Sequence, residues 1–153
     1  MLFAIAQDFN PGFKFNFMAL IGYSGTPLAK KLGIKEGFKI KLINQPDNYY
    51  DLFTDFPGQV FIISEVQTKI DFIHYFVLDK TELILNISEL KSEIVPNGML
   101  WISWPKKSSG IQTNIDENTI RNVAIDNGMV DIKVCAIDNI WSGLKLVIPL
   151  KNR

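Results

Sequence analysis

Two apolar stretches separated by one amphipathic helix pattern constrain the fold more than any other feature of the chain. Residues 70–78, IDFIHYFVL, and residues 99–105, MLWISWP, are apolar nearly throughout, which is typical of strands covered on both faces. Between them, aliphatic side chains recur at helical spacing and line one face. These residues are Leu83, Ile87, Leu90 and Ile94. A strand, a helix of this length and a second strand form a right-handed crossover, so the sequence predicts two parallel strands.

Capping signals delimit this helix and a later one. Asp79 and Glu82 form a capping box ahead of the first helix, and Pro-Asn-Gly at 96–98 is expected to end it. Asp116 is the expected N-cap of the second helix, which Asn-Gly at 127–128 ends. The lysine-serine loop that closes the stretch at 99–110 therefore lies between a buried strand and a helix start.

Shorter patterned segments precede this unit. Residues 38–44 and 60–63 are apolar runs bounded by glycine or proline, and they predict two more strands. Residues 26–33 predict a short helix with the Thr26 hydroxyl as N-cap and glycine at its end. Asp47 is expected to cap a helical turn that carries two tyrosines.

The end of the chain has a different pattern. Residues 129–149 alternate apolar and polar side chains on both sides of a polar turn at 138–143, which is typical of an antiparallel hairpin at a sheet edge. The whole order predicts an α/β fold: a three-layer sandwich with a mostly parallel, Rossmann-like sheet and an antiparallel C-terminal hairpin. With 153 residues, 47% of them hydrophobic, the chain suits one domain, which we place at residues 18–150.

Residues 1–17 fit this domain less well. Their apolar run is broken by Asp8, Asn10 and Pro11, and they lack the positive start and small-residue cleavage site of a signal peptide. Two interpretations stay open: a loosely attached arm, or a misannotated N-terminal extension ahead of a true start at Met18.

Charge and composition exclude several classes of site and partner. Lysine plus arginine and aspartate plus glutamate both number 16, so nucleic acid is not an expected partner and any basic site must be local. No apolar run approaches the ~20 residues that span a bilayer, so no membrane partner is expected. His74 and Cys135 are the only residues of their kinds. They leave no basis for a disulfide or a metal centre and suit a reducing, cytoplasmic location.

The second half of the chain resembles the core of class I methyltransferases. It shares with them a helix, the strand at 99–105, another helix and a closing hairpin with one reversed strand. The resemblance implies a Rossmann-like fold and, in that family, S-adenosylmethionine held by a glycine-rich loop after the first strand. Here the corresponding residues, 43–50, read INQPDNYY without glycine. The backbone cannot approach that cofactor in the usual way, so we expect the fold, do not expect S-adenosylmethionine and leave the cofactor unknown.

Local sequence is similar to a family of small bacterial proteins classed as a domain of unknown function. The shared stretches are GYSGTPLAKKLGI at 22–34, MLWISWPKKSSG at 99–110, VDIKVCAID at 130–138 and WSGLKLV at 141–147. The family has Thr-Asp where this chain has Thr113-Asn114. The resemblance covers roughly residues 21–148 and implies no activity, because the family has none assigned.

Ligands of open α/β sheets bind beyond the carboxyl ends of the parallel strands. The lysine-serine loop falls at that edge, and the hairpin tip is expected beside it. We predict a site there for an anionic small molecule, with lysines as charge partners, hydroxyls as donors and a tryptophan as a stacking surface. The candidate ligand-binding residues are Lys106, Lys107, Ser109, Thr113, Trp141, Ser142, Ser24 and Thr26. The site requires that Ser109 and Trp141 lie on a common rim of one sheet.

These residues and their neighbours also have structural interpretations. Paired lysines in a loop are usually solvated, and a tryptophan closes a core as readily as it stacks on a ligand. Arg121 is expected to form a surface ion pair, His74 to be a hydrogen-bonded core residue and Cys135 to serve packing. The chain has neither a Gly-x-Ser-x-Gly elbow nor a glycine-rich phosphate loop, so no catalytic residue is assigned.

Two functions of different classes follow. The first is binding, or binding and turnover, of an anionic or nucleotide-like small molecule at the carboxyl edge of the sheet. The alternative is a non-catalytic interaction or regulatory module, with a protein partner, on a methyltransferase-like fold that has lost its cofactor site. Methyl transfer comes third. The sequence assigns neither a reaction nor an oligomeric state.

Overall fold

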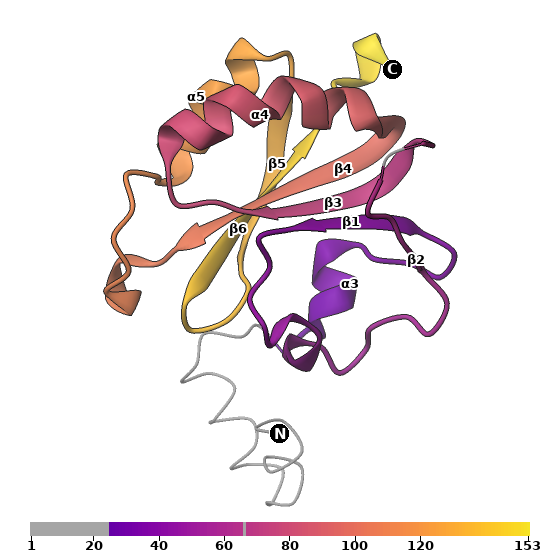
Figure 1. Ribbon diagram of the computed structural model, residues 1–153, viewed down its shortest axis with the longest axis horizontal. Coiled ribbons are helices and arrows are strands. Elements are labelled where there is room, and N and C mark those ends of the chain that lie inside the picture. Colours follow the sequence, from indigo (N-terminus) through magenta and orange to yellow (C-terminus); the bar gives the residue numbers. More distant parts are fainter. Residues whose placement is uncertain (1–24, 66) are drawn as a thin grey trace, which may run out of the picture.

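The computed structural model describes residues 25–65 and 67–153. Within those residues six strands form one sheet in the order β2-β1-β3-β4-β6-β5 (Figure 1). In chain order the elements are α3 Leu28–Leu32, β1 Lys39–Ile43, η1 Tyr49–Leu52, β2 Phe61–Ile62, β3 Ile70–Phe76, α4 Lys80–Glu93, β4 Ile94–Pro105, η2 Lys107–Ser109, α5 Glu117–Asp126, β5 Val130–Ala136, β6 Trp141–Val147 and η3 Leu150–Asn152. The predictions for residues 1–17, Met18 and Ser24 fall outside the described residues.

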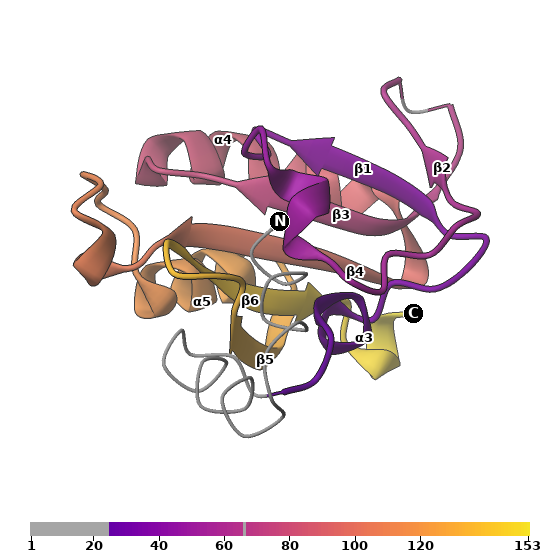
Figure 2. The ribbon, with the colours of Figure 1, turned by 90° about the horizontal axis from the view of Figure 1, so that it is seen from below.

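The sheet is parallel except at one side. β2, β1, β3 and β4 run parallel, while β6 runs antiparallel to both β4 and the edge strand β5. The parallel pair around one helix and the C-terminal hairpin are therefore confirmed. Helices α4 and α5 cover one face of the sheet and α3 lies on the other, as Figures 1 and 2 show together. The fold is the expected three-layer α/β sandwich.

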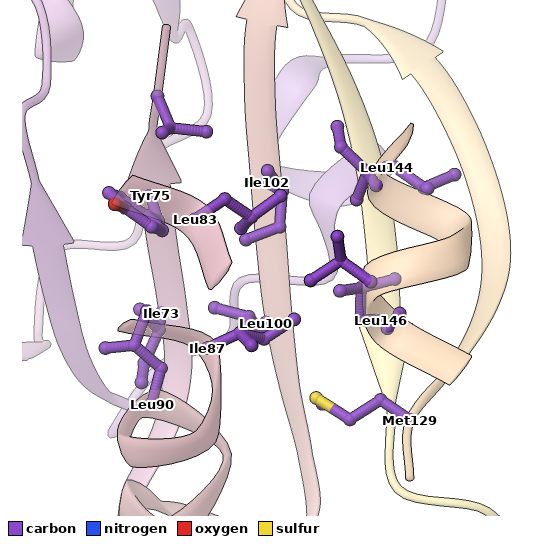
Figure 3. Close-up of a cluster of buried hydrophobic side chains, with 14 of the residues drawn as sticks. Ile73, Tyr75, Leu83, Ile87, Leu90, Leu100, Ile102, Met129, Leu144 and Leu146 are labelled. Carbon is purple, nitrogen blue, oxygen red and sulfur yellow. The ribbon is translucent and has the colours of Figure 1, made fainter. Parts of the chain in front are cut away.

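The core under α4 and α5 follows from the helical spacing of aliphatic residues. Figure 3 shows Leu83, Ile87 and Leu90 of α4 lying against Ile73 of β3 and Leu100 of β4. The five side chains are buried. Truncation of such a side chain to alanine costs about 2–5 kcal/mol, so this face anchors the sheet and the loops that leave it.

The opposite face carries a second, more aromatic core. The indole Nε1 of Trp101 in β4 donates to the carbonyl oxygen of Leu32 at 2.9 Å, which fixes the end of α3 to the middle of the sheet. Gly33 then ends α3 with φ of 84°, a left-handed conformation that favours glycine. Tyr49 from η1 is buried in the same core. This helix and turn therefore cover the face that α4 and α5 leave open.

Two predicted caps are confirmed and two are wrong. Asp79 accepts from the amide of Glu82, as the capping box predicted, and Asp116 caps α5. Thr26 and Asp47 make no capping bond. Instead, the carboxylate of Asp55 caps α3 from 26 positions away by accepting from the amides of Ala29 and Lys30 at 2.9 and 3.0 Å. A cap supplied by a distant loop leaves no local sequence pattern.

The end of α4 was also misplaced. The helix stops at Glu93, and residues 96–98 lie inside β4, which begins at Ile94. Ile94 pairs with Ile70 and Met99 with Phe72, and the register shifts between these pairs. Pro96 has no N–H to give to a strand ladder, so an irregular stretch of strand accommodates it.

None of the helices in residues 25–65 and 67–153 is long and apolar enough to cross a lipid bilayer. In the same part of the chain, no group of three or more His, Cys, Asp or Glu side chains is placed to hold a metal ion.

Candidate functional site

The carboxyl ends of β1, β3 and β4 lie at one edge of the sheet, because those strands are parallel. There the loop after β4 contacts the tip of the β5–β6 hairpin. The amide of Lys106 donates to the carbonyl oxygen of Ile140 at 2.7 Å, and Pro105 pairs with Trp141. The Ser109 hydroxyl donates to the carbonyl oxygen of Lys106 at 2.7 Å. Ser109 and Trp141 therefore lie on a common rim, as the predicted site requires.

A cleft of about 520 Å³ opens at this edge between the end of β4 and the start of α5. Its volume lies in the range of small-molecule sites, and its lining combines apolar with polar residues. The lining residues are Trp104, Pro105, Lys107, Gly110, Ile111, Gln112, Thr113, Asn114, Ile115 and Asp116. Lys107 and Thr113 are thus the predicted site residues that the cleft brings together.

The two loop lysines have different surroundings. Lys107 lines the cleft. Its charge helps to lower the pKa of Asp116, after the hydrogen bonds that this carboxylate accepts from Thr119. Lys106 does not line this cleft, and its charge acts on Lys31, whose pKa is lowered first by burial and also by its lysine neighbours. The cleft therefore contains one of the two predicted charge partners.

The hydroxyl groups of Ser109 and Thr113, predicted as donors to a ligand, already donate to backbone carbonyl oxygens. The Ser109 hydroxyl donates to the carbonyl oxygen of Lys106 and accepts from the amide of Ile111. The Thr113 hydroxyl donates to the carbonyl oxygen of Leu78 at 2.6 Å and accepts from the amide of Ile115. A hydroxyl has one proton to donate. In this structure Ser109 and Thr113 therefore shape the loop.

Asn114 joins this loop to the start of α4. Its Oδ1 accepts from the amide of Lys80 at 2.7 Å, and its Nδ2 donates to Oδ1 of Asp79 at 3.1 Å. Oδ2 of the same carboxylate accepts from the amide of Glu82 at 3.1 Å. The side-chain amide thus serves as both donor and acceptor at the start of α4. These contacts fix the wall of the cleft nearest to β3.

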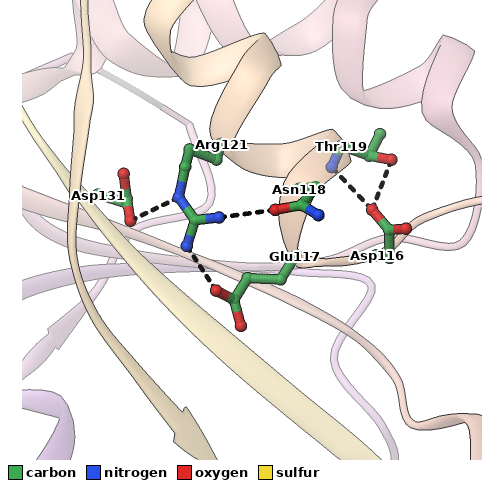
Figure 4. A network of polar contacts seen from close by, with 6 residues as sticks. All are labelled: Asp116, Glu117, Asn118, Thr119, Arg121 and Asp131. Atoms are coloured by element: carbon green, nitrogen blue, oxygen red, sulfur yellow. Dashed lines mark hydrogen bonds and ion pairs between the residues drawn. The ribbon is translucent and has the colours of Figure 1, made fainter.

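The opposite wall is fixed at the start of α5. Figure 4 shows Oδ1 of Asp116 accepting from both the amide and the hydroxyl of Thr119, each at 2.8 Å. In the same network Arg121 bonds to Glu117, and to Asp131 of β5 at 3.0 Å. The surface ion pair predicted for Arg121 is confirmed, and it holds α5 against the edge strand.

The remaining predicted residues lie outside the cleft. Trp141 packs edge-on against Phe76 with ring centroids 5.0 Å apart, within the core on the α3 side. Ser142 pairs with Trp104 and with Ala136 inside the sheet. Thr26 is exposed just before α3. Ser24 lies outside the described residues. The structure therefore separates this group from Lys107 and Thr113.

Sequence reasoning missed the aromatic residue of the cleft. Trp104 is 8% exposed and lies one position before the strand end, on the same side of β4 as Leu100 and Ile102. The alternation of strand residues already groups these three. Which side of the strand faces a cleft depends on the placement of α5, and no short-range pattern carries that information.

The strand order places the topological switch point of the fold between β1 and β3, because the chain continues to β2 on one side and to β4 on the other. There Asn44 has φ of 57°, and its Nδ2 donates to the carbonyl oxygen of Phe76 at 3.3 Å. This side chain links the ends of the two strands. With no glycine at 44–48, the residues at the switch point do not fit S-adenosylmethionine as a glycine-rich loop does.

A polar chain is buried beneath the same strands. Nδ1 of His74 lies 2.9 Å from the Tyr49 hydroxyl, and Nε2 lies 2.7 Å from the Ser103 hydroxyl. All three side chains are buried, and burial lowers the pKa of His74 to about 3. The prediction of a hydrogen-bonded core histidine is confirmed, and the ring has no contact with the cleft.

Comparison with solved structures finds this fold in methyltransferases. A SAM-dependent methyltransferase from Aquifex aeolicus aligns with a TM-score of 0.58 at 18% identity, covering 78% of this chain and 87% of its own. A putative type 11 methyltransferase from Sulfolobus solfataricus aligns with 0.54 at 18% identity, covering 79% and 89%. Magnesium protoporphyrin IX methyltransferase from Synechocystis PCC 6803, solved with bound SAM, aligns with 0.51 at 14% identity, covering 80% and 74%.

No protein-family model matches the chain, and no curated protein matches it significantly in sequence. The structural likeness shows a methyltransferase-like Rossmann fold, as the layout of the sequence predicted. The similarity to a family of unknown function stays a prediction.

Proposed function

We propose that this protein binds an anionic, nucleotide-like small molecule in the cleft between β4 and α5. One observation carries the proposal: a single cleft holds a tryptophan, further apolar residues and a lysine at the edge where open α/β sheets bind ligands. A flat heterocyclic ring packs on an aromatic or apolar wall, and a phosphate group pairs with an ammonium group. A nucleotide offers both groups in one molecule.

Different residues of the cleft contact different parts of the ligand. The half-exposed Ile111 and the accessible edge of the mostly buried Trp104 provide the apolar contact for the ring, and Lys107 provides the charge. Ser109 and Thr113 hold the loop in the conformation that forms the cleft. Lys106, Trp141, Ser142 and Thr26 contact only a ligand that extends over the rim to the α3 side.

S-adenosylmethionine is the necessary comparator, because the fold is that of methyltransferases. It carries a positive sulfonium, which Lys107 repels, and the Asn44 link lies where its usual loop is found. We therefore expect nucleoside diphosphates to bind more tightly than S-adenosylmethionine.

Thermal-shift and calorimetric titrations test the proposal with nucleoside mono- and diphosphates, inorganic phosphate, an uncharged nucleoside and S-adenosylmethionine. A ligand at ~100 times its dissociation constant stabilises the folded state by about 2.7 kcal/mol, which raises the melting temperature by roughly 5–10 °C. We expect K107A to weaken nucleotide binding at least tenfold, and K151A, which removes an exposed lysine outside the cleft, to leave it unchanged. Equal affinities in the two variants would exclude this cleft.

A second candidate is the non-catalytic interaction module. The switch point favours it, since a side-chain bond between Asn44 and Phe76 joins the strand ends there, in place of the glycine-rich loop that a cofactor of this fold uses. If none of the small molecules shifts the melting temperature and the protein co-purifies with one stoichiometric partner, this candidate replaces the first.

A further inference from the structure

The cleft between β4 and α5 contains both signs of charge. Lys107 and Asp116 line it together, and neither belongs to an ion pair within residues 25–65 and 67–153. A phosphate group pairs with Lys107 but leaves the carboxylate of Asp116 facing the ligand without a donor. Covering a charged acceptor without giving it a hydrogen bond is costly. A ligand that fills this cleft should therefore carry hydrogen-bond donors in addition to its phosphate.

The carboxylate of Asp116 can accept further hydrogen bonds. Both bonds from Thr119 end on Oδ1, as Figure 4 shows, whereas a carboxylate has about four acceptor positions. The same two bonds lower the pKa of Asp116, so the group is ionised at neutral pH and acts only as an acceptor. Oδ2 can therefore accept from a ligand in the cleft.

Gln112 gives the same cleft a hydrogen-bond donor. It is exposed, and its side-chain amide forms no hydrogen bond with the part of the chain that the structure describes. The backbone on either side is held in place, because the amide of Ile111 donates to the Ser109 hydroxyl and the Thr113 hydroxyl donates to the carbonyl oxygen of Leu78. A side-chain amide both donates and accepts. A fixed loop therefore presents an amide that a ligand can engage.

Among the nucleotide bases, guanine carries the groups that match these two side chains. Its N1–H and 2-amino groups are adjacent donors and its O6 is an acceptor, whereas adenine has an acceptor at N1 and no 2-amino group. A carboxylate accepts from both guanine donors, but its lone pairs oppose the lone pair of adenine N1. A site built around such hydrogen bonds strongly rejects a base that lacks them.

We propose that the cleft is specific for guanine nucleotides, with Asp116 accepting from N1–H and the 2-amino group and Gln112 donating to O6. This inference rests on the proposed function and names the base of the nucleotide. Ile111 and the edge of Trp104 contact the ring of any base, and Lys107 pairs with the phosphate, so these three residues do not distinguish one base from another. The specificity for the base therefore depends on Asp116 and Gln112.

Calorimetric titrations with guanosine, inosine and adenosine diphosphate (GDP, IDP and ADP), in EDTA and again with Mg²⁺, test the proposal. IDP keeps the N1–H and O6 of guanine and lacks the 2-amino group. We expect the wild type to bind GDP roughly tenfold or more tightly than ADP, with IDP between them, in EDTA and in Mg²⁺ alike. A preference seen only with Mg²⁺ would assign Asp116 to a metal ion on the phosphates and overturn the proposal.

The test variant is D116N. Asparagine caps a helix about as well as aspartate, so D116N should keep α5 while a donor replaces one acceptor oxygen. We expect GDP binding to weaken roughly tenfold or more, and ADP binding to stay the same or become tighter. The matched control is D126N, the same change at the other end of α5 and outside the cleft, which should bind both nucleotides as the wild type does.

A second variant, Q112A, covers the case in which D116N fails to fold, because Gln112 is exposed and its removal breaks no hydrogen bond within the described residues. We expect Q112A to weaken GDP binding by about threefold to tenfold and to leave ADP binding unchanged. If K107A weakens both nucleotides while D116N and Q112A leave the ratio of GDP to ADP affinity unchanged, the proposed function stands and the specificity for guanine is wrong. If neither nucleotide binds to the wild type, both are wrong.

Discussion

Nδ2 of Asn44 donates to the carbonyl oxygen of Phe76 and so links the ends of β1 and β3, the strands on either side of the switch point. This bond lies at the switch point, where open α/β sheets bind their ligands, while a cleft opens beside the neighbouring strand β4. This relationship is why the proposed ligand site lies next to Trp104 and Lys107 and not at the loop after β1.

The backbone at Asn44 predicts an unusual order of stabilities. Its φ of 57° is a left-handed conformation, which asparagine and glycine tolerate and other residues adopt at a cost of about 1–2 kcal/mol. Both N44A and N44G remove the bond to Phe76. N44A should therefore be less stable than N44G by about 1–2 kcal/mol in urea unfolding, and the reverse order would contradict the assigned conformation.

Burial of His74 predicts that the stability of the protein depends on pH. Because the chain has one histidine, the titration of this ring is simple to follow. Its pKa is about 3 in the folded protein against roughly 6.5 in the unfolded chain, so folding favours the neutral ring. Its contribution to stability is complete above pH 6.5 and is lost as pH falls from 6.5 toward 3, by at most about 1.4 kcal/mol per pH unit. The ring Hε1 resonance should stay unchanged between pH 8 and 5. A titration centred near 6.5 would disprove the buried chain.

Asn114 should not tolerate aspartate. In N114D a carboxylate replaces the amide that donates to Asp79, and two negative oxygens meet where a hydrogen bond was. We expect a loss of about 1–3 kcal/mol at pH 7, measured by urea unfolding, from the lost hydrogen bond and the repulsion between the two carboxylates. N122D, the same change at an exposed position of α5, is the control and should cost less than about 0.5 kcal/mol.

The caps of α3 and η1 give a matched pair of aspartates. D55A removes a carboxylate that accepts two amides at the start of α3, and should cost about 0.5–2 kcal/mol. D47A removes one that makes no capping bond, and should be nearly neutral. The urea midpoints of D55A and D47A show which of the two aspartates caps a helix. A larger loss in D47A would favour the cap expected from the sequence.

Local patterns predicted most of the fold, because each of its strands and long helices has a signal of its own. The apolar run at 70–78 and the spacing of Leu83 and Ile87 were enough for the parallel crossover. The features that were predicted wrongly depend on contacts with residues far along the chain. Asp55 caps a helix 26 positions away, and a register shift against β3 takes residues 96–98 into a strand.

The candidate site was predictable as a region but less so in its contacts. The chain order placed the lysine-serine loop and Trp141 on one rim, which the structure confirms. Hydrogen-bond acceptors for Ser109 and Thr113 come from the folded backbone, and the sides on which Lys106 and Lys107 lie depend on the turn after Pro105. Sequence patterns at short range do not specify any of these.

The most direct test of the ligand site is chemical-shift mapping of the ¹⁵N-labelled protein during titration with a nucleoside diphosphate. We expect the largest changes at the indole N–H of Trp104 and the amides of residues 110–116, and we expect K107A to reduce them greatly. Largest changes at residues 44–48 and 77–79, or no changes in the cleft at saturating nucleotide, would contradict it.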